Sequence, residues 1–197
     1  KLHRVSSLSL KHRLATVVYF STIGLGFMWL EILLIIKSNM IMDAVTASVA
    51  VVVTAMLLGA GTSSWFFVGK KPAALPLTRL LIPIIFCILS LPIVFDKLFI
   101  LSADWHWNLR GLLIFVTTYL SGLLLGVWLP NGLLQLKKSG AEALAWTWGI
   151  NGFASVIGAL TAPLLAMHGG LYLLSACAAM CYLLAGVIFA RFRLAAQ

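Results

Sequence analysis

The chain has few charged residues, and very few of them are acidic. Only 10% of its 197 residues are Asp, Glu, Lys or Arg, and Asp and Glu together number five. A soluble domain carries roughly 25% charged residues, so this shortage excludes a soluble globular class. Hydrophobic residues make up 62% of the chain, which is typical of an integral membrane protein.

Cysteine is also scarce, which excludes a disulfide framework. Cys87, Cys177 and Cys181 fall inside hydrophobic runs, and no two of them form a CxxC pair. We interpret them as small apolar packing residues. Cys177 and Cys181 could share a helix face, but two thiols without further ligands make a poor metal site. No metal or cofactor is therefore expected, while a bound lipid or pigment stays open.

Six hydrophobic segments are long enough to cross a membrane, because about 20 apolar residues in a helix span its hydrocarbon core. The sequence predicts an all-α membrane domain over residues 14–192, after a basic leader (1–13) and before a cytoplasmic tail (193–197). The third segment contains Pro83 and Pro92 and is expected to be kinked. The predicted spans are 14–36, 44–67, 80–101, 111–134, 143–166 and 171–190.

The basic residues behind the net charge of +9 lie mostly on one side of the predicted spans. With six spans, eleven of the 14 Lys and Arg residues fall on the side of the two termini, and only Lys37, Lys97 and Arg110 fall on the other. Basic flanks resist translocation, so both termini are predicted to be cytoplasmic, in a bacterial inner membrane. Since topology explains the charge, no nucleic-acid partner is expected.

Small residues in the spans mark where helices are expected to approach one another. Lipid tails give helices no hydrophobic reason to associate, so close backbone contact and polar bonds must hold them together. The GxxxG pattern at 122–126 marks packing more often than function. The residues expected at helix contacts are Gly24, Gly26, Gly122, Gly126, Gly149, Gly152, Ser155 and Gly158.

Three polar residues inside the spans are candidates for function: Glu31, Asn131 and Asn151. An ionised carboxylate in the membrane costs about 3 kcal/mol, so Glu31 should face the bundle, be protonated or find a partner. With no basic residue predicted inside any span, a proton or cation site and a buried polar anchor stay open for it. Asn151 is expected to bond across a helix contact beside Ser155, at a depth that permits contact with Asn131.

Tryptophan and histidine gather near the predicted ends of the spans. Tryptophan is enriched at the membrane–water interface, so these positions are expected to lie at headgroup level. Haem, chlorin or metal ligation is the alternative for the histidines at 106 and 168. The expected interfacial residues are Trp105, His106, Trp107, Trp146 and Trp148.

A faint internal repeat links the first and fourth predicted spans. These spans run in opposite directions, as a 3+3 inverted repeat of transporter type requires. The matching residues are Tyr19, Ser21, Leu25 and Gly26 and, one hundred positions later, Tyr119, Ser121, Leu125 and Gly126.

Three segments resemble a known family: YFSTIGLGFMWLEI (19–32), WLPNGL (128–133) and AWTWGINGFASVIGALTAPLLAMHGG (145–170). They are similar to the C-terminal membrane region of bacterial proteins related to spermidine synthase. The resemblance implies a fold like half of a major facilitator transporter, beside a soluble synthase-like domain. This chain has no glycine-rich cofactor loop of that domain, so no enzyme activity is expected. It begins at Lys1 without Met or a cleavable signal, so a preceding segment is expected.

Three classes of function follow. The first is a non-catalytic membrane subunit or anchor in a lipid bilayer, packed with other membrane subunits or as a homo-oligomer. The second is a transporter-like half that moves a small solute, with Glu31, Asn131 and Asn151 as its polar pathway. The third is the membrane part of a polyamine aminopropyltransferase. One carboxylate in the spans, no intramembrane cation and no second half favour the first.

Overall fold

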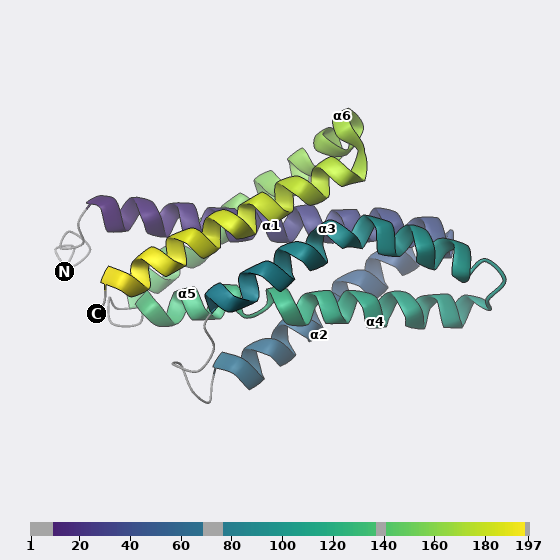
Figure 1. Cartoon of the computed structure of the whole chain (residues 1–197), viewed down its shortest axis with the longest axis horizontal. Coiled ribbons are helices and arrows are strands. Elements are labelled where there is room, and N and C mark those ends of the chain that lie inside the picture. Colours follow the sequence, from purple (N-terminus) through teal and green to yellow (C-terminus); the bar gives the residue numbers. More distant parts are fainter. Residues whose placement is uncertain (1–9, 69–76, 137–140, 196–197) are drawn as a thin grey trace.

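The computed structural model describes residues 10–68, 77–136 and 141–195, and the elements in these ranges are all helices. They pack as an elongated bundle (Figure 1), so the predicted all-α class is confirmed. Five helical runs are long and apolar enough to cross a membrane: His12–Met42, Val45–Phe66, Arg79–Leu101, Trp107–Leu136 and Ala141–Arg191. The helices are α1 (Leu10–Met42), α2 (Val45–Val68), α3 (Leu77–Leu101), α4 (Trp107–Leu125), α5 (Trp128–Leu136) and α6 (Ala141–Ala195).

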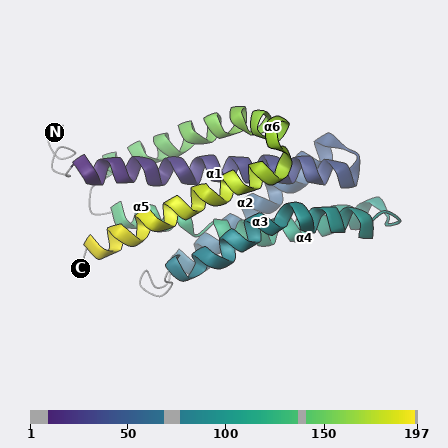
Figure 2. The ribbon, with the colours of Figure 1, turned by 45° about the horizontal axis from the view of Figure 1, so that its top comes forward.

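The long helix α6 reverses direction at Gly170. The backbone there has φ 71° and ψ −175°, a combination that glycine adopts and L side chains rarely do. We call residues 141–169 the first arm and 171–195 the second arm of α6. Figure 2 shows the first arm running along α1 and the second arm returning toward the end at which α1 begins. The predicted segments 143–166 and 171–190 are therefore the two arms of one hairpin.

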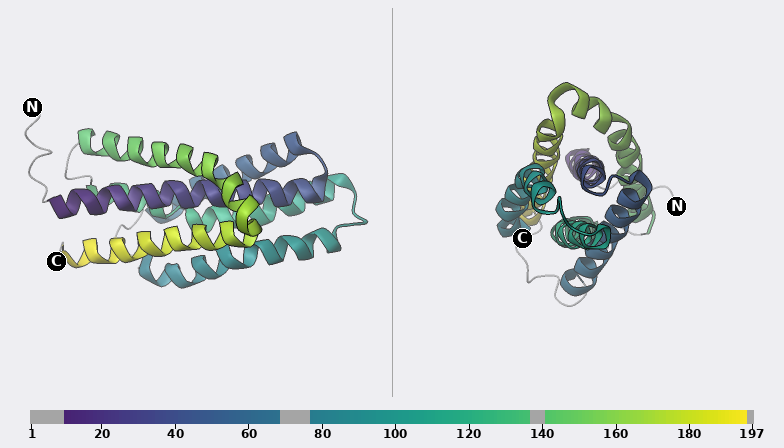
Figure 3. Two further views of the ribbon diagram at one scale, coloured as in Figure 1. Left: turned by 90° about the horizontal axis from the view of Figure 1, so that it is seen from above. Right: turned by 90° about the vertical axis from the view of Figure 1, so that its right-hand side faces the viewer.

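The two ends of the bundle differ in what they contain. α1 begins and α6 ends at one end, which we call the proximal end (Figure 1). The opposite, distal end carries the α1–α2 turn and the α3–α4 loop, and α6 reverses on that side, short of the end itself (Figure 3). In the α1–α2 turn Asp43 takes a positive φ of 50°, which aspartate tolerates better than most residues.

Helix α1 lies in the middle of the bundle. Seen from the distal end, α6 arches over α1 while α2, α3 and α4 lie on its other sides (Figure 3). Leu30, Leu33 and Leu34 of α1 are fully buried. Side chains of the surrounding helices therefore contact α1 on several sides (Figure 3).

The predicted fourth span is broken into α4 and α5 at Gly126 and Val127. Pro130 has no N–H to donate to the Gly126 carbonyl, so the regular helical ladder cannot continue. Nearby carbonyls gain side-chain partners. Tyr19 Oη donates to the Trp128 carbonyl at 2.8 Å, and Asn131 Nδ2 donates to the Val127 carbonyl at 2.7 Å. The Val127 carbonyl also accepts from the Asn131 N–H at 3.3 Å, so the two side chains strengthen the start of α5 and do not replace the donor missing at Pro130.

Helix α3 continues through Pro83 and Pro92. Pro92 cannot donate to the carbonyl of Ile88, four residues earlier. Ser175 Oγ, on the second arm of α6, donates to that carbonyl at 2.7 Å and is buried. The proline thus frees an acceptor through which α3 is tied to α6.

Two boundary expectations change. α1 runs from Leu10 to Met42, beyond the predicted 14–36 at both ends, and α6 reaches Ala195, inside the predicted tail. The longer α1 places Lys37 within a helical run that is long and apolar enough to cross a membrane. Burial of Lys37 is possible because it meets an opposite charge on α3. Residues 1–9 of the leader, and the lysine pairs at 70–71 and 137–138, lie outside the described residues.

Candidate functional site

Asn151 and Ser155 join the first arm of α6 to α1. Asn151 Nδ2 donates to the Phe20 carbonyl at 3.1 Å, and Ser155 Oγ lies 3.4 Å from the Gly24 carbonyl. A Cβ atom at Gly24 would lie 2.5 Å from the Asn151 carbonyl oxygen. The glycine is therefore what allows the two backbones to come this close.

The same contact continues toward the distal end. Trp29 Nε1 donates to Thr161 Oγ1 at 3.0 Å, and a Cβ at Gly158 would lie 3.0 Å from the Cβ of Met28. The residue numbers of the contacting pairs rise together, so α1 and the first arm run parallel (Figure 3). The motif around Asn151 is thus one side of a polar, glycine-lined helix interface.

Asn131 and Glu31 do not join that interface. Asn131 donates within its own helical turn, to Val127. Glu31 is half-buried on α1, and among the described residues no hydrogen bond or ion pair to its carboxylate is found. Within the same part of the chain, no hydrogen bond links Asn131 to Asn151; Asn151 donates to α1 instead.

A charged cluster at the distal end was not expected from the sequence. Lys37 Nζ of α1 forms an ion pair with Asp96 Oδ1 of α3, and Tyr172 Oη of α6 donates to Asp96 Oδ2 at 3.1 Å. The side chain of Lys37 is 8% exposed and that of Asp96 is 43% exposed. One carboxylate therefore holds three helices. The available signal was that spans one and three end on the same side with opposite charges.

Arg110 organises the backbone near this cluster. Its Nη1 donates to the Ile41 carbonyl and its Nε to the Trp105 carbonyl, each at 3.1 Å. Its Nη2 donates to the Ala103 carbonyl. Arg110 thus ties the α3–α4 loop to the end of α1, where helix carbonyls lack intrahelical partners.

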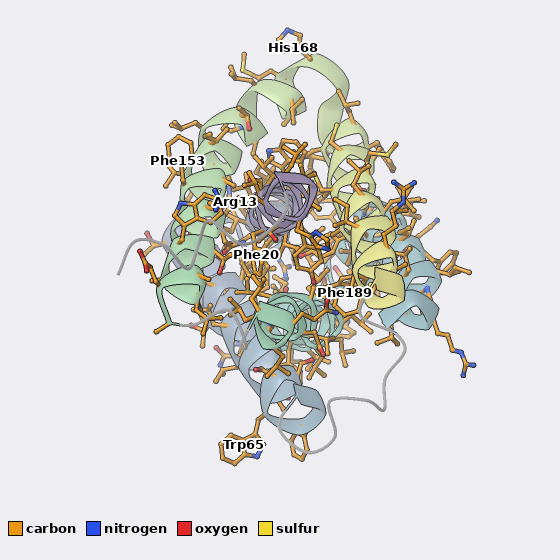
Figure 4. All side chains as sticks on the ribbon, turned by 90° about the vertical axis from the view of Figure 1, so that its left-hand side faces the viewer. Arg13, Phe20, Trp65, Phe153, His168 and Phe189 are labelled. Atoms are coloured by element: carbon orange, nitrogen blue, oxygen red, sulfur yellow. The ribbon has the colours of Figure 1, made fainter. Side chains whose placement is uncertain are left out.

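Aromatic side chains from α1, α5 and α6 meet in the proximal half. The ring of Trp128 lies 6.2 Å from Tyr182 and 6.4 Å from Phe189, and Tyr19 lies 6.0 Å from Phe189. Phe20 and Phe189 lie within the ring of helices, between α1, α5 and the second arm (Figure 4). Trp128 Nε1 and Tyr182 Oη are buried without a hydrogen-bond partner among the described residues. WLPNGL and YFSTIG, two of the quoted motifs, therefore pack against each other.

Most of the small residues expected at helix contacts are in such contacts. A Cβ at Gly26 would meet Tyr182, and one at Gly122 would lie 2.6 Å from the Met56 carbonyl oxygen of α2. Gly126 lies equally close to Ala60 of α2. Gly149 and Gly152 are the exceptions, since a Cβ at either would meet nothing within 4 Å. They are exposed on the first arm, and among the described residues neither of them packs against another helix.

The expected interfacial residues are all exposed: Trp105, His106, Trp107, Trp146 and Trp148. The His106 side chain accepts from the Asn108 N–H and caps α4, and His168 Nδ1 lies 2.8 Å from the Leu164 carbonyl oxygen. Within the described ranges, no group of three or more His, Cys, Asp or Glu side chains is placed to hold a metal ion. His106 thus has its partner in the first turn of α4, and His168 has its partner within α6.

Comparisons of this chain with protein-family models, with curated proteins and with solved structures give no match.

Proposed function

We propose that the chain is a non-catalytic, multi-pass membrane subunit that packs within a larger membrane assembly. The main observation in support is the use of its polar residues. Asn151, Ser155 and Asn131 all bond to backbone carbonyls of the helix framework. At the same time Gly149 and Gly152 present open backbone on the outer side of the first arm. Such a surface lets a helix of another subunit approach closely.

The proposed topology has six crossings in a bacterial inner membrane. α1, α2, α3 and the α4–α5 run each cross once, and the two arms of α6 cross once each. Arg13, Arg79 and Arg191 belong to proximal helix ends, whereas Lys97 and Arg110 belong to distal ones. The positive-inside rule then places the proximal end in the cytoplasm.

The helix contacts support a 3+3 inverted repeat, as in half of a major facilitator transporter. In the first half, α1 uses Gly24 to approach the first arm of α6, which is the second crossing of the other half. In the second half, α4 uses Gly122 and Gly126 to approach α2, the second crossing of the first half. Both pairs run parallel (Figure 1). This correspondence also supports the proposed kinship with the membrane region of spermidine-synthase-like proteins.

The test is the composition of the complex purified in mild detergent from native membranes, by native mass spectrometry. The chain should co-purify with other membrane subunits in fixed ratio. The double variant Gly149→Leu/Gly152→Leu should lose them, because two leucines fill the open backbone. Gly61→Leu is the matched control, since Gly61 is also exposed with nothing within 4 Å. A chain that purifies alone, or partners that survive the double variant, would contradict the proposal.

A transporter-like half is the second candidate, favoured by the inverted-repeat contacts and by Glu31. That carboxylate is half-buried in the middle of α1, where a proton or cation would stabilise it. Proton flux into dye-loaded liposomes holding the full chain should then depend on Glu31 and be lost in Glu31→Gln. Glu142→Gln, a change at an exposed carboxylate at the start of α6, should leave it intact. Equal flux with and without the protein would exclude this candidate.

A further inference from the structure

We propose that Lys37, Asp96 and Tyr172 form a latch that holds the distal end of the bundle closed. Release of the latch separates the distal part of α1 from α3 and the second arm of α6. This inference goes beyond the proposed function, and it applies to a subunit and to a transporter half alike.

In the latch, one carboxylate on α3 contacts side chains of two other helices, α1 and α6. Asp96 of α3 pairs with the Lys37 ammonium of α1 through one oxygen and accepts from Tyr172 of α6 through the other. Tyr172 lies two residues beyond Gly170, where α6 reverses. Loss of a single negative charge would therefore weaken two helix contacts together.

The two charged partners are unequally buried, which makes the closed arrangement dependent on Asp96. The Lys37 side chain is 8% exposed, whereas the Asp96 side chain is 43% exposed. If the carboxylate is neutralised, the largely buried ammonium is left without its counter-ion. A buried charge of this kind is far less stable than a hydrated one, so α1 gains by moving its distal part toward water.

Two further polar groups beside Lys37 also favour opening. Ser38 is fully buried, and its Oγ has no hydrogen-bond partner among the described residues; the same holds for Oδ1 of Asn39. Buried polar atoms are normally paired, so the closed form leaves these two unsatisfied. Opening the distal end would hydrate both. The latch thus stabilises the closed form, whereas hydration of Ser38 and Asn39 would stabilise the open form. Two opposing effects of this kind allow a protein to exist in two states.

The rest of the bundle confines the movement to the distal end. In the proximal half, Tyr19 Oη bonds to the Trp128 carbonyl at 2.8 Å, and Trp128 packs on Tyr182 of the second arm. Ser175 Oγ ties the second arm to Ile88 of α3 at 2.7 Å. The second arm and α3 are therefore expected to move together, away from the part of α1 around Lys37. Full separation of the end of α1 must also break the bond from Arg110 Nη1 to the Ile41 carbonyl.

A buried cysteine reporter tests the latch. The three native cysteines are replaced by alanine, and Ser38→Cys is introduced in the full chain in lipid nanodiscs, which leave both ends accessible. The rate of its reaction with a membrane-impermeant maleimide measures opening. Asp96→Asn should raise that rate at least about 10-fold, which corresponds to a shift of about 1.4 kcal/mol in the closed–open equilibrium. Exchanging the charges, as Lys37→Asp with Asp96→Lys, should bring the rate back to within about 3-fold of the starting chain.

A second reporter separates opening from unfolding. Ala185→Cys places the thiol at a fully buried position in the proximal half of the second arm, and its rate should not change in any variant. Tyr172→Phe removes one bond and no charge, so it should raise the Ser38→Cys rate by less than Asp96→Asn does. An unchanged rate at Ser38→Cys in Asp96→Asn would overturn the proposal, as would an equal rise at both reporters.

Discussion

Gly24→Ala should weaken the contact between α1 and the first arm of α6. The added Cβ would lie 2.5 Å from the Asn151 carbonyl oxygen and 3.1 Å from Ser155 Oγ. Both belong to a neighbouring helix and the first to its backbone, so the two helices must separate by roughly 1 Å. A gap of that size forfeits a quarter to a half of the dispersion energy of the atoms it parts. The 3.4 Å contact between Ser155 Oγ and the Gly24 carbonyl would be lost first, because the single hydroxyl proton of Ser155 can go to the Asn151 carbonyl at 2.9 Å.

The expected loss combines three effects. Overpacking a fitted interface costs about 1–3 kcal/mol, each lost interhelical hydrogen bond costs about 0.6 kcal/mol, and the higher helix propensity of alanine returns up to about 1 kcal/mol. Gly24→Ala should therefore reduce the free energy of unfolding by about 1–3 kcal/mol. Denaturation in mixed micelles, followed by tryptophan fluorescence, measures it. Gly152→Ala is the matched control, because its Cβ meets nothing within 4 Å, and it should be neutral or stabilising. Equal effects of the two changes would refute the reasoning.

Three other substitutions test single features of the fold by the same unfolding measurement. Ser175→Ala should lower the free energy of unfolding by about 1–2 kcal/mol, because it leaves the Ile88 carbonyl without a hydrogen-bond donor. Pro92→Ala restores the backbone N–H that would donate to this carbonyl, so Ser175→Ala should lower the free energy of unfolding clearly less when Pro92→Ala is also present. Gly170→Ala should cost about 1–3 kcal/mol through its positive φ, although no atom lies within 4 Å of the new Cβ, and no loss would mean that α6 reverses differently. Asp96→Asn should cost about 1–3 kcal/mol, because Lys37 is buried but water partly screens the 43% exposed carboxylate; no loss of stability would show that Lys37 is hydrated.

Hydropathy predicted the helices well, because every helical turn that faces lipid must carry apolar side chains. The six predicted segments are helical over the residues described, except at Ala44 and at the break formed by Gly126 and Val127. The break between segments 143–166 and 171–190 coincides with the reversal at Gly170. A pair of glycines in a long apolar run is a local signal, and the reversal needs only local backbone freedom. The division of the fourth segment was harder to predict, since Pro130 acts on a carbonyl four residues earlier.

The contacts that could not be predicted all depend on a partner far away in the sequence. Lys37 was assigned to a loop because a hydropathy window ends at a charge, whereas the helix continues when Asp96 neutralises it. Ser175 gave no sign that it would replace the donor missing at Pro92. Gly149 and Gly152 indicate that a neighbour can approach, but a glycine does not say on which side of the helix that neighbour lies.

The two ends of the bundle are held by different chemistry, and this difference bears on the choice between the two proposed functions. A transporter half must open at each end in turn, so each end needs a contact that can be broken reversibly. The distal end has one in the Lys37–Asp96 pair. The proximal half is held by Trp128, Tyr182 and Phe189, which are buried and make aromatic contacts without a charge. Contacts of that kind have no single group whose titration or displacement releases them. Among the described residues, this difference predicts that the helices separate more readily around the Lys37–Asp96 pair than around Trp128.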